Sequence, residues 1–143
     1  PLGRVITIGY YALINSENFN LKAGFTASEA KWVKVNEISD LIYDHNEILN
    51  ASLEHLREKV RRAPIGFNLL PEQFTLLQLM ELYQQILNIE VDKSNFRRKF
   101  LKMKLLQDNG DKQEGVSHRA AKLYSFDKTI YETLTKKGFN FEF

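Results

Sequence analysis

The stretch FTLLQLMELYQQILNIEVDKSNFRRKFLKMKLL, residues 74–106, contains two successive helical patterns with a short turn between them. In the first pattern, Thr75 and Gln78 have the spacing of a capping box, and apolar residues follow at helical intervals. In the second pattern, Asp92 stands where it can cap a helix that ends near Leu106. The stretch therefore predicts two helices joined by a tight turn.

Positive charge is concentrated on the second of these helices. No acidic residue occurs between positions 93 and 104, although the whole chain has a net charge of only +2. The cations in this segment are Lys93, Arg97, Arg98, Lys99, Lys102 and Lys104. Such a local concentration is typical of a surface that follows a phosphate backbone.

A helical wheel at about 100° per residue separates the apolar from the polar residues of this helix. Phe96, Phe100 and Met103 fall on one stripe, which is expected to face the core. The residues opposite that stripe are Ser94, Asn95, Arg98 and Lys102. Arg can bond guanine, Asn can bond adenine and Lys neutralises phosphate, so this face has the chemistry of a DNA recognition helix. The common alternative for a run of charges is a solvated surface.

Turn residues and a further apolar run follow the basic helix. QDNGDKQEG, residues 107–115, is polar and contains two glycines, and AAKLYSF, residues 120–126, reads as a strand. A helix, a turn, a basic helix and a strand pair around a polar loop form the plan of a winged helix-turn-helix, with residues 107–119 as the wing. The basic residues expected in or beside the wing are His118, Arg119 and Lys122.

The N-terminal region combines strand-like segments with one long helix. RVITIGYYALI, residues 4–14, is β-branched and aromatic and predicts a buried strand, and residues 30–36 predict a second strand. Apolar residues at intervals of three and four predict an amphipathic helix from Asp44 or Asn46 to Arg62. Because two strands and a helix are too few to close a sheet domain, we expect the later part of an α/β domain whose beginning lies upstream.

Six segments of the chain resemble one known family. They are GRVITIGYYALI, EAKWVKV, LIYDHNEIL, PIGFNLLPEQFTLLQLMELYQQIL, DKSNFRRKF and AAKLYSFD. The resemblance extends over nearly the whole chain. The family is the Nudix-related transcriptional regulators of the NrtR type, including their arabinose-regulator branch. The most specific part of the resemblance is the LLPxxFTLxxLxxLY block followed by NFRRK.

The resemblance implies a fold, a function and partners. Residues 1–64 would be the C-terminal portion of a Nudix-fold sensor domain and residues 65–143 a winged helix domain, which gives an α+β fold class. Members of the family are homodimers that bind a palindromic operator in double-stranded DNA, and ADP-ribose or a pentose sets the occupancy. The resemblance places Asn95, Arg97, Arg98 and Lys99 in the recognition helix and Arg119 in or beside the wing.

The Nudix box, whose glutamate-rich helix holds the metal ions for pyrophosphate hydrolysis, does not occur in these residues. The chain is therefore expected to be inactive by itself and to need no cofactor, and Mg²⁺ would belong to an intact Nudix domain. Whether the parent protein is an ADP-ribose pyrophosphatase stays open. The carboxylates of this region have no paired spacing with histidines that would suggest a metal site; they include Glu29, Glu37, Asp40 and Asp44.

Two further expectations concern the N-terminal region. Asp44 and His45 could contact a small-molecule effector, because loops at sheet edges often do so, while capping of the following helix is the simpler role for Asp44. The aromatic residues Tyr10, Tyr11 and Trp32 are expected to serve mainly as apolar packing.

The composition is that of an ordinary globular protein with 43% hydrophobic residues and no cysteine. No apolar run is long enough to span a membrane, so a cytoplasmic protein is expected. Three functions remain open at this point: a ligand-responsive DNA-binding regulator, a fragment of a Nudix hydrolase and a protein-interaction module. A steep salt dependence of duplex binding favours the first, and hydrolysis of ADP-ribose by the full parent with magnesium favours the second.

Overall fold

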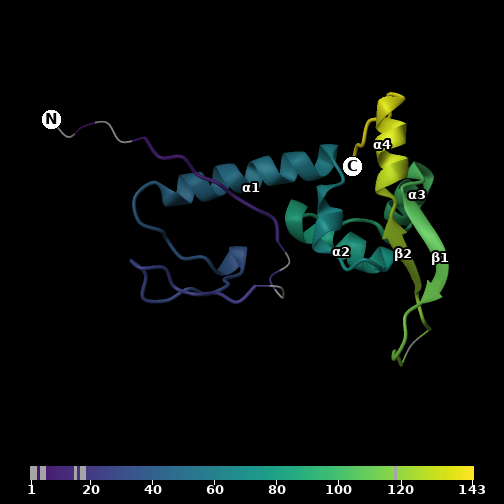
Figure 1. Cartoon of the computed structure of the whole chain (residues 1–143), viewed down its shortest axis with the longest axis horizontal. Helices are drawn as coiled ribbons and strands as arrows, with labels where there is room; N and C mark the ends of the chain where they lie inside the picture. Colours follow the sequence, from purple (N-terminus) through teal and green to yellow (C-terminus); the bar gives the residue numbers. More distant parts are fainter. Residues whose placement is uncertain (1–2, 4–5, 15, 17–18, 118) are drawn as a thin grey trace. The chain divides into compact units, whose positions relative to one another are not determined.

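The computed structural model describes residues 3, 6–14, 16, 19–117 and 119–143. The chain divides into two compact units, Pro1–His55 and Leu56–Phe143. Its elements, in chain order, are the 3-10 helix η2 (Val35–Glu37), α1 (His45–Arg62), the 3-10 helix η3 (Ile65–Leu69), α2 (Leu76–Leu87), α3 (Lys93–Met103), β1 (Leu106–Lys112), β2 (Lys122–Phe126) and α4 (Lys128–Lys136) (Figure 1). None of the helices in the described residues is long and apolar enough to cross a membrane.

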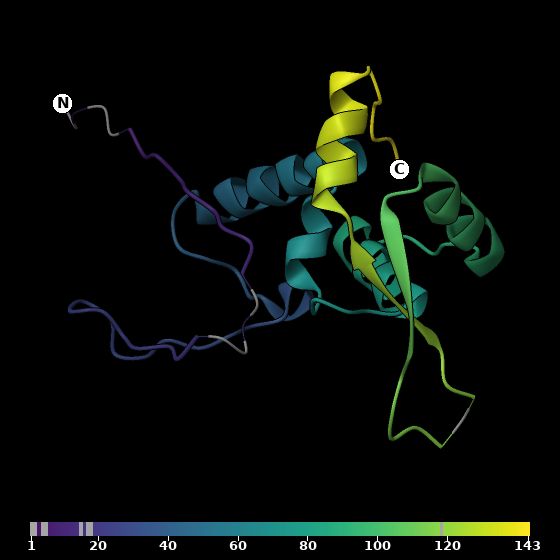
Figure 2. The same cartoon turned by 45° about the vertical axis from the view of Figure 1, so that its right-hand side comes forward.

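The second unit is a winged helix built on helices and a small antiparallel sheet. β1 pairs with β2 from Leu106 opposite Phe126 onward, and the register is irregular between Asp108 and Lys112. Phe74, just before α2, adds a short antiparallel bridge to Tyr124 of β2. The loop between β1 and β2 extends away from the helices as a wing (Figure 2). The α+β winged helix expected from the sequence is confirmed.

Local sequence signals explain where α2 and α3 begin. The Thr75 hydroxyl accepts a hydrogen bond from Gln78 N–H at 3.1 Å, and the Gln78 side chain accepts one from Thr75 N–H at 2.8 Å, so the predicted capping box is confirmed. At α3, the Asp92 carboxylate accepts from Asn95 N–H at 2.7 Å, as predicted. Lys104 ends α3 in a left-handed conformation with φ of 55°. The helix is therefore slightly shorter than the sequence pattern indicated.

An aromatic core holds the second unit together. Phe96 and Phe100 project from α3 into it, with their rings 4.4 Å apart, and Tyr83 of α2 meets Phe100 edge to face at 5.2 Å. The buried hydrophobic residues are Val60, Phe67, Phe74, Leu79, Met80, Tyr83, Leu87, Phe96, Phe100, Leu105, Tyr124 and Phe141. Met103 is half-buried against them, so the apolar stripe predicted for α3 is confirmed.

The prediction of two strands in the first unit is wrong. Residues 6–14 have no regular secondary structure, residues 4 and 5 lie outside the described residues, and residues 30–36 contain only the beginning of η2. A strand exists through hydrogen bonds to a neighbouring strand, and none of the described residues pairs with these segments. Most of their apolar side chains stay exposed; Ile6, for example, is 77% exposed.

The aromatic residues of the first unit do not pack as expected. Tyr10 is 91% exposed and Trp32 is 54% exposed, and Tyr11 meets the His55 ring edge-on at 5.8 Å while remaining exposed. The assignment of these three side chains to a core is therefore wrong, because the strands that would have placed them there are not formed. The helix predicted in this region is confirmed, since α1 begins at His45 and ends at Arg62.

Tyr83 is a fully buried residue whose hydroxyl finds no hydrogen-bond partner in the described residues. Burial raises the pKa of this hydroxyl above its ordinary value of 10.0. Because a buried polar group without a partner lowers stability, we expect Tyr83→Phe to raise the free energy of unfolding by about 1 kcal/mol near pH 7. Urea unfolding followed by circular dichroism measures this difference.

The difference in stability between the wild type and Tyr83→Phe should depend on pH. A raised pKa in the folded state means that the stability of the wild type is fully present below pH 10 and falls as the pH rises above 10, because the unfolded chain releases the Tyr83 proton first. The Phe variant lacks this contribution, so the stability difference between the two proteins should widen above pH 10. A variant that is clearly less stable than the wild type at pH 7 would show that the hydroxyl has a bonding partner.

Candidate nucleic-acid interface

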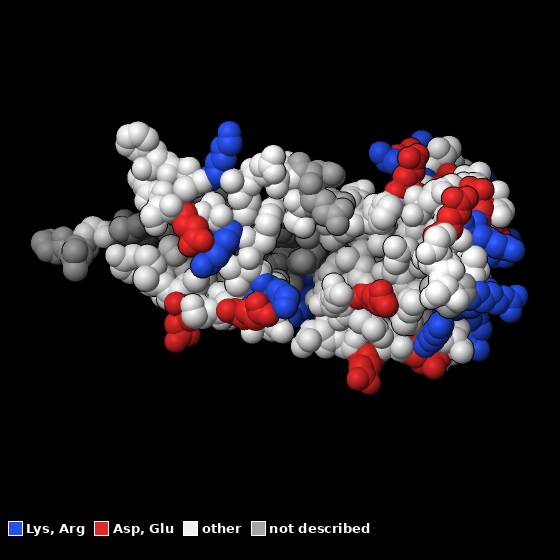
Figure 3. All heavy atoms as spheres, turned by 90° about the horizontal axis from the view of Figure 1, so that it is seen from below, with Lys and Arg blue, Asp and Glu red and all other residues white. Residues whose placement is uncertain are grey.

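The exposed face of α3 gathers the cations that the sequence singled out. Phe96 and Phe100 anchor the helix in the core, so the residues on the other side are left in solvent. The exposed members of the predicted set on this helix are Lys93, Ser94, Asn95, Arg97, Arg98, Lys99 and Lys102. Figure 3 shows Lys and Arg side chains gathered at the right of the view, where Figure 1 draws α3 and the hairpin, with acidic side chains among them.

Two of these side chains bond to each other. Arg98 Nη2 donates to Asn95 Oδ1 at 2.7 Å, one helical turn apart on the exposed face. Asn95 is in turn fixed at its backbone, because its N–H donates to the Asp92 carboxylate. The Arg98 guanidinium therefore has a defined direction and keeps further N–H donors free for a partner. Both residues were predicted to face DNA, and their spacing of three residues was the available sign that their side chains could pair.

Lys99 points to a different neighbour. Its Nζ lies 5.2 Å from the centre of the Phe143 ring, in the geometry of a cation–π contact. The sequence grouped Lys99 with the other cations of the helix, and nothing in the spacing of α3 could have indicated an aromatic partner so far along the chain.

Lys122 lies at the start of β2, in the hairpin that follows α3. Lys122 Nζ lies 2.7 Å from Asp108 Oδ2, a bond between β2 and β1. This hydrogen bond lowers the pKa of Asp108 and raises the pKa of Lys122, while the nearby charge of Arg97 acts in the opposite direction on Lys122. Arg97 on α3 and Lys122 on β2 both add positive charge to the second unit, and the ion pair with Asp108 offsets part of the charge of Lys122.

A second predicted wing residue, Arg119, lies in the loop between the two strands. Arg119 is exposed there, and His118 lies outside the described residues. β1 runs to Lys112 and β2 starts at Lys122, so the predicted wing of residues 107–119 covers most of β1 and most of this loop. Gln73 Nε2 donates to Asp111 Oδ2 at 2.8 Å and ties the base of α2 to β1.

The residues predicted to contact an effector lie at the start of α1. Asp44 and His45 are both exposed, and the His45 ring meets Tyr43 edge-on at 6.1 Å. The Asp44 carbonyl accepts from the N–H groups of Glu47 and Ile48. The side-chain bond at this helix start comes from Asn46, whose Oδ1 accepts from Leu41 N–H at 3.3 Å.

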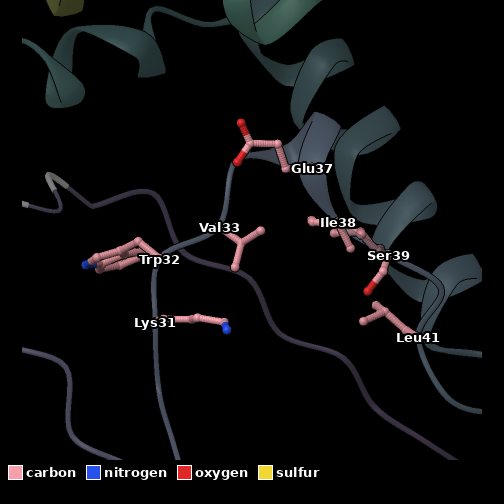
Figure 4. A pocket seen from close by; sticks show the side chains of 8 residues that line it. Lys31, Trp32, Val33, Glu37, Ile38, Ser39 and Leu41 are labelled. Carbon is pink, nitrogen blue, oxygen red and sulfur yellow. The ribbon is translucent and has the colours of Figure 1, made fainter.

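An open pocket of about 640 Å³ lies elsewhere in the first unit. Its lining residues are Lys31, Trp32, Val33, Glu37, Ile38, Ser39, Leu41 and Leu49 (Figure 4). Neither Asp44 nor His45 belongs to this lining. The pocket was not predicted from the sequence, because the pattern of residues 30–36 indicated a strand with Trp32 in the core.

The arrangement of helices and hairpin in the second unit is suited to binding double-stranded DNA. A capped helix projects polar and cationic side chains from a rigid aromatic core, and a preceding helix and a following hairpin flank it. Residues 66–126 match the model of the NrtR DNA-binding winged helix domain. This segment is an NrtR-type winged helix domain.

Known proteins similar to the chain carry related names. An "ADPR responsive transcriptional repressor NtrR" from Acinetobacter baylyi is 29% identical over 134 residues, which are 92% of this chain and 53% of that protein. The chain thus spans about half the length of this curated relative. The NrtR-type domain of the chain accounts for the central part of its second unit, and α4 follows directly after it.

Two solved structures of Shewanella oneidensis NrtR are also similar. One is a complex with a 27mer DNA, with a TM-score of 0.52 and 29% sequence identity. The other is a crystal structure of NrtR, with a TM-score of 0.50 and 30% sequence identity. Each match covers 61% of this chain and 39% of the solved chain. These similarities agree with the NrtR-type fold of the domain.

Proposed function

We propose that this chain is the DNA-reading part of a transcriptional repressor, and that α3 binds in the major groove of double-stranded DNA. The observation that carries the proposal is the exposed polar and cationic face of α3, held by the buried Phe96 and Phe100 in an NrtR-type domain. Arg98 would bond base edges near the start of the helix, while Lys93, Arg97 and Lys102 would neutralise phosphates. Arg119 and Lys122 of the wing would contact the flanking backbone.

Recognition of a long site requires more than one copy of the domain. A single short helix reaches only a few base pairs, so a two-fold dimer would place two copies of α3 about one helical turn apart or a multiple of it. We therefore propose a homodimer and an operator that is an inverted repeat.

The effector and the sensor domain belong to the same proposal. Residues 1–64 would be the C-terminal portion of a Nudix-fold sensor, and residues 65–143 a winged helix DNA-binding domain. ADP-ribose is the first candidate effector, because the similar Acinetobacter protein is described as ADPR responsive. A pentose is the second candidate, by resemblance to the arabinose-regulator branch. Asp44 and His45 stay candidates for contact with such a molecule.

Selection of duplexes from a random pool tests the DNA-binding part of the proposal. The wild-type chain should enrich a defined sequence with two-fold symmetry, and enriched duplexes should bind more tightly than scrambled ones. Recovery of unchanged random sequence after repeated rounds would contradict base reading by α3. ADP-ribose and arabinose are then added to the complex of the full-length protein with the enriched duplex, and release by either one identifies the effector class.

A further inference from the structure

The segment after α4 turns back onto the core of the second unit. Gly138 has a φ of 88°, a conformation that favours glycine, and Phe139 N–H donates to Leu134 O at 2.9 Å. The segment that follows, Phe139–Phe143, alternates three phenylalanines with the exposed Asn140 and Glu142. Phe141 is only 2% exposed, so the apolar side of this segment is part of the core.

Phe143 joins the end of α1 to the recognition helix. Its N–H donates to Arg61 O in the last turn of α1 at 2.9 Å. Its ring lies 5.6 Å from Phe96 and 5.7 Å from Phe100, the two side chains that anchor α3. The ring also meets Tyr83 of α2 edge-on at 4.6 Å. One side chain therefore touches α2 and α3 while its backbone is bonded to α1.

Lys99 of α3 also contacts Phe143. With Phe96 and Phe100 directed into the core, the ammonium of Lys99 reaches the Phe143 ring on the flank of the helix. A lysine whose charge is placed over an aromatic ring is less available for a phosphate than its neighbours.

We infer that the segment Phe139–Phe143 positions the recognition helix through Phe143, and that Lys99 serves to hold this segment instead of contacting DNA phosphate. Base reading depends on side chains held within a fraction of an ångström by the residues behind them. Phe143 supports the two anchors of α3 and so sets the direction of Arg98. The inference rests on the proposed DNA binding and assigns Phe143 as a positioning residue.

The salt dependence of binding separates the two roles of the lysines. Lys102→Gln should reduce the slope of log affinity against log salt by about one, because it removes a phosphate contact. Lys99→Gln should leave that slope unchanged. A reduction by about one for Lys99→Gln as well would make Lys99 a phosphate contact and would overturn its assignment.

Phe143→Ala tests the positioning role. We expect the preference for the enriched duplex over scrambled DNA to fall about tenfold, with little change in affinity for scrambled DNA, at a temperature where circular dichroism shows the variant folded. Phe143→Tyr keeps the ring and should restore the preference. Tyr131→Ala removes the contact between the Tyr131 ring on α4 and the Phe126 ring on β2, and it serves as a control for destabilisation alone. Equal losses on both duplexes, or the same loss of preference in the control, would overturn the role of Phe143.

Amide hydrogen exchange gives a readout that does not depend on DNA. In Phe143→Ala, exchange in α3 should accelerate more than exchange in α2, because α3 loses the support behind both of its anchors. Uniform acceleration across the two helices would contradict the positioning role. If the wild type bound no duplex, the proposed function would fail while this comparison would still decide the role of Phe143.

Discussion

Replacing Phe100 with alanine is expected to lower the free energy of unfolding by about 3–5 kcal/mol, enough to unfold much of the second unit. Phe100 is 0% exposed, and its ring lies within 6.4 Å of the rings of Phe67, Tyr83, Phe96, Phe141 and Phe143. Alanine removes the surface that joins these rings and leaves a cavity that the packed aromatic neighbours cannot fill. Urea unfolding followed by far-ultraviolet circular dichroism measures the change.

Leu101→Ala is the matched control for this experiment. Leu101 is the next residue of α3, about 100° around the helix from Phe100, and it is 38% exposed. Its replacement should change stability by less than about 1 kcal/mol, because little apolar surface leaves the core. Equal effects of the two substitutions would mean that α3 does not use Phe100 as an anchor.

Duplex binding by the wild type should depend steeply on salt. If the cations of α3 and the wing neutralise roughly six phosphates, affinity should fall by about a thousandfold between about 50 and 200 mM salt. The reason is that the release of counterions from DNA is less favourable when the bulk salt concentration is higher. Fluorescence anisotropy with a labelled duplex at a series of salt concentrations measures the slope.

A charge-neutralised variant gives the control for the salt series. A variant combining Lys93→Gln, Arg97→Gln and Lys102→Gln, which removes the three proposed phosphate contacts of α3, should make the slope shallower by about three. A control combining Lys31→Gln, Lys34→Gln and Lys59→Gln removes the same charge from other exposed positions and should leave the slope nearly unchanged. A shallow slope in the wild type would favour an interaction with a partner other than DNA.

The second unit could be predicted from the sequence because its signals are local. Thr75 with Gln78 and Asp92 with Asn95 form caps within one helical turn, and Phe96 and Phe100 share a face through their spacing alone. These features need no knowledge of distant residues. The recognition helix and its exposed face followed directly from them.

The first unit could not be predicted in the same way. Apolar and β-branched residues in 6–14 favour a strand, but a strand forms only when another strand offers hydrogen bonds, and the described residues offer none. The exposure of Trp32 follows from the same missing pairing. The neighbour of Lys99 was equally hidden, since Phe143 reaches it only after α4 and the turn at Gly138 have reversed the chain.

Base reading by Arg98 is the central claim, and the most direct test compares Arg98→Ala with Lys104→Ala on two duplexes. Arg98 lies on the exposed face of α3 and is directed by Asn95, whereas Lys104 follows the last turn of the helix. We expect Arg98→Ala to cost about 1–3 kcal/mol on the enriched duplex and to blur the preference at one base pair in each half-site. Lys104→Ala should weaken both duplexes alike. Equal losses on enriched and scrambled DNA would remove Arg98 from base reading, and no loss on either would contradict DNA binding by this face.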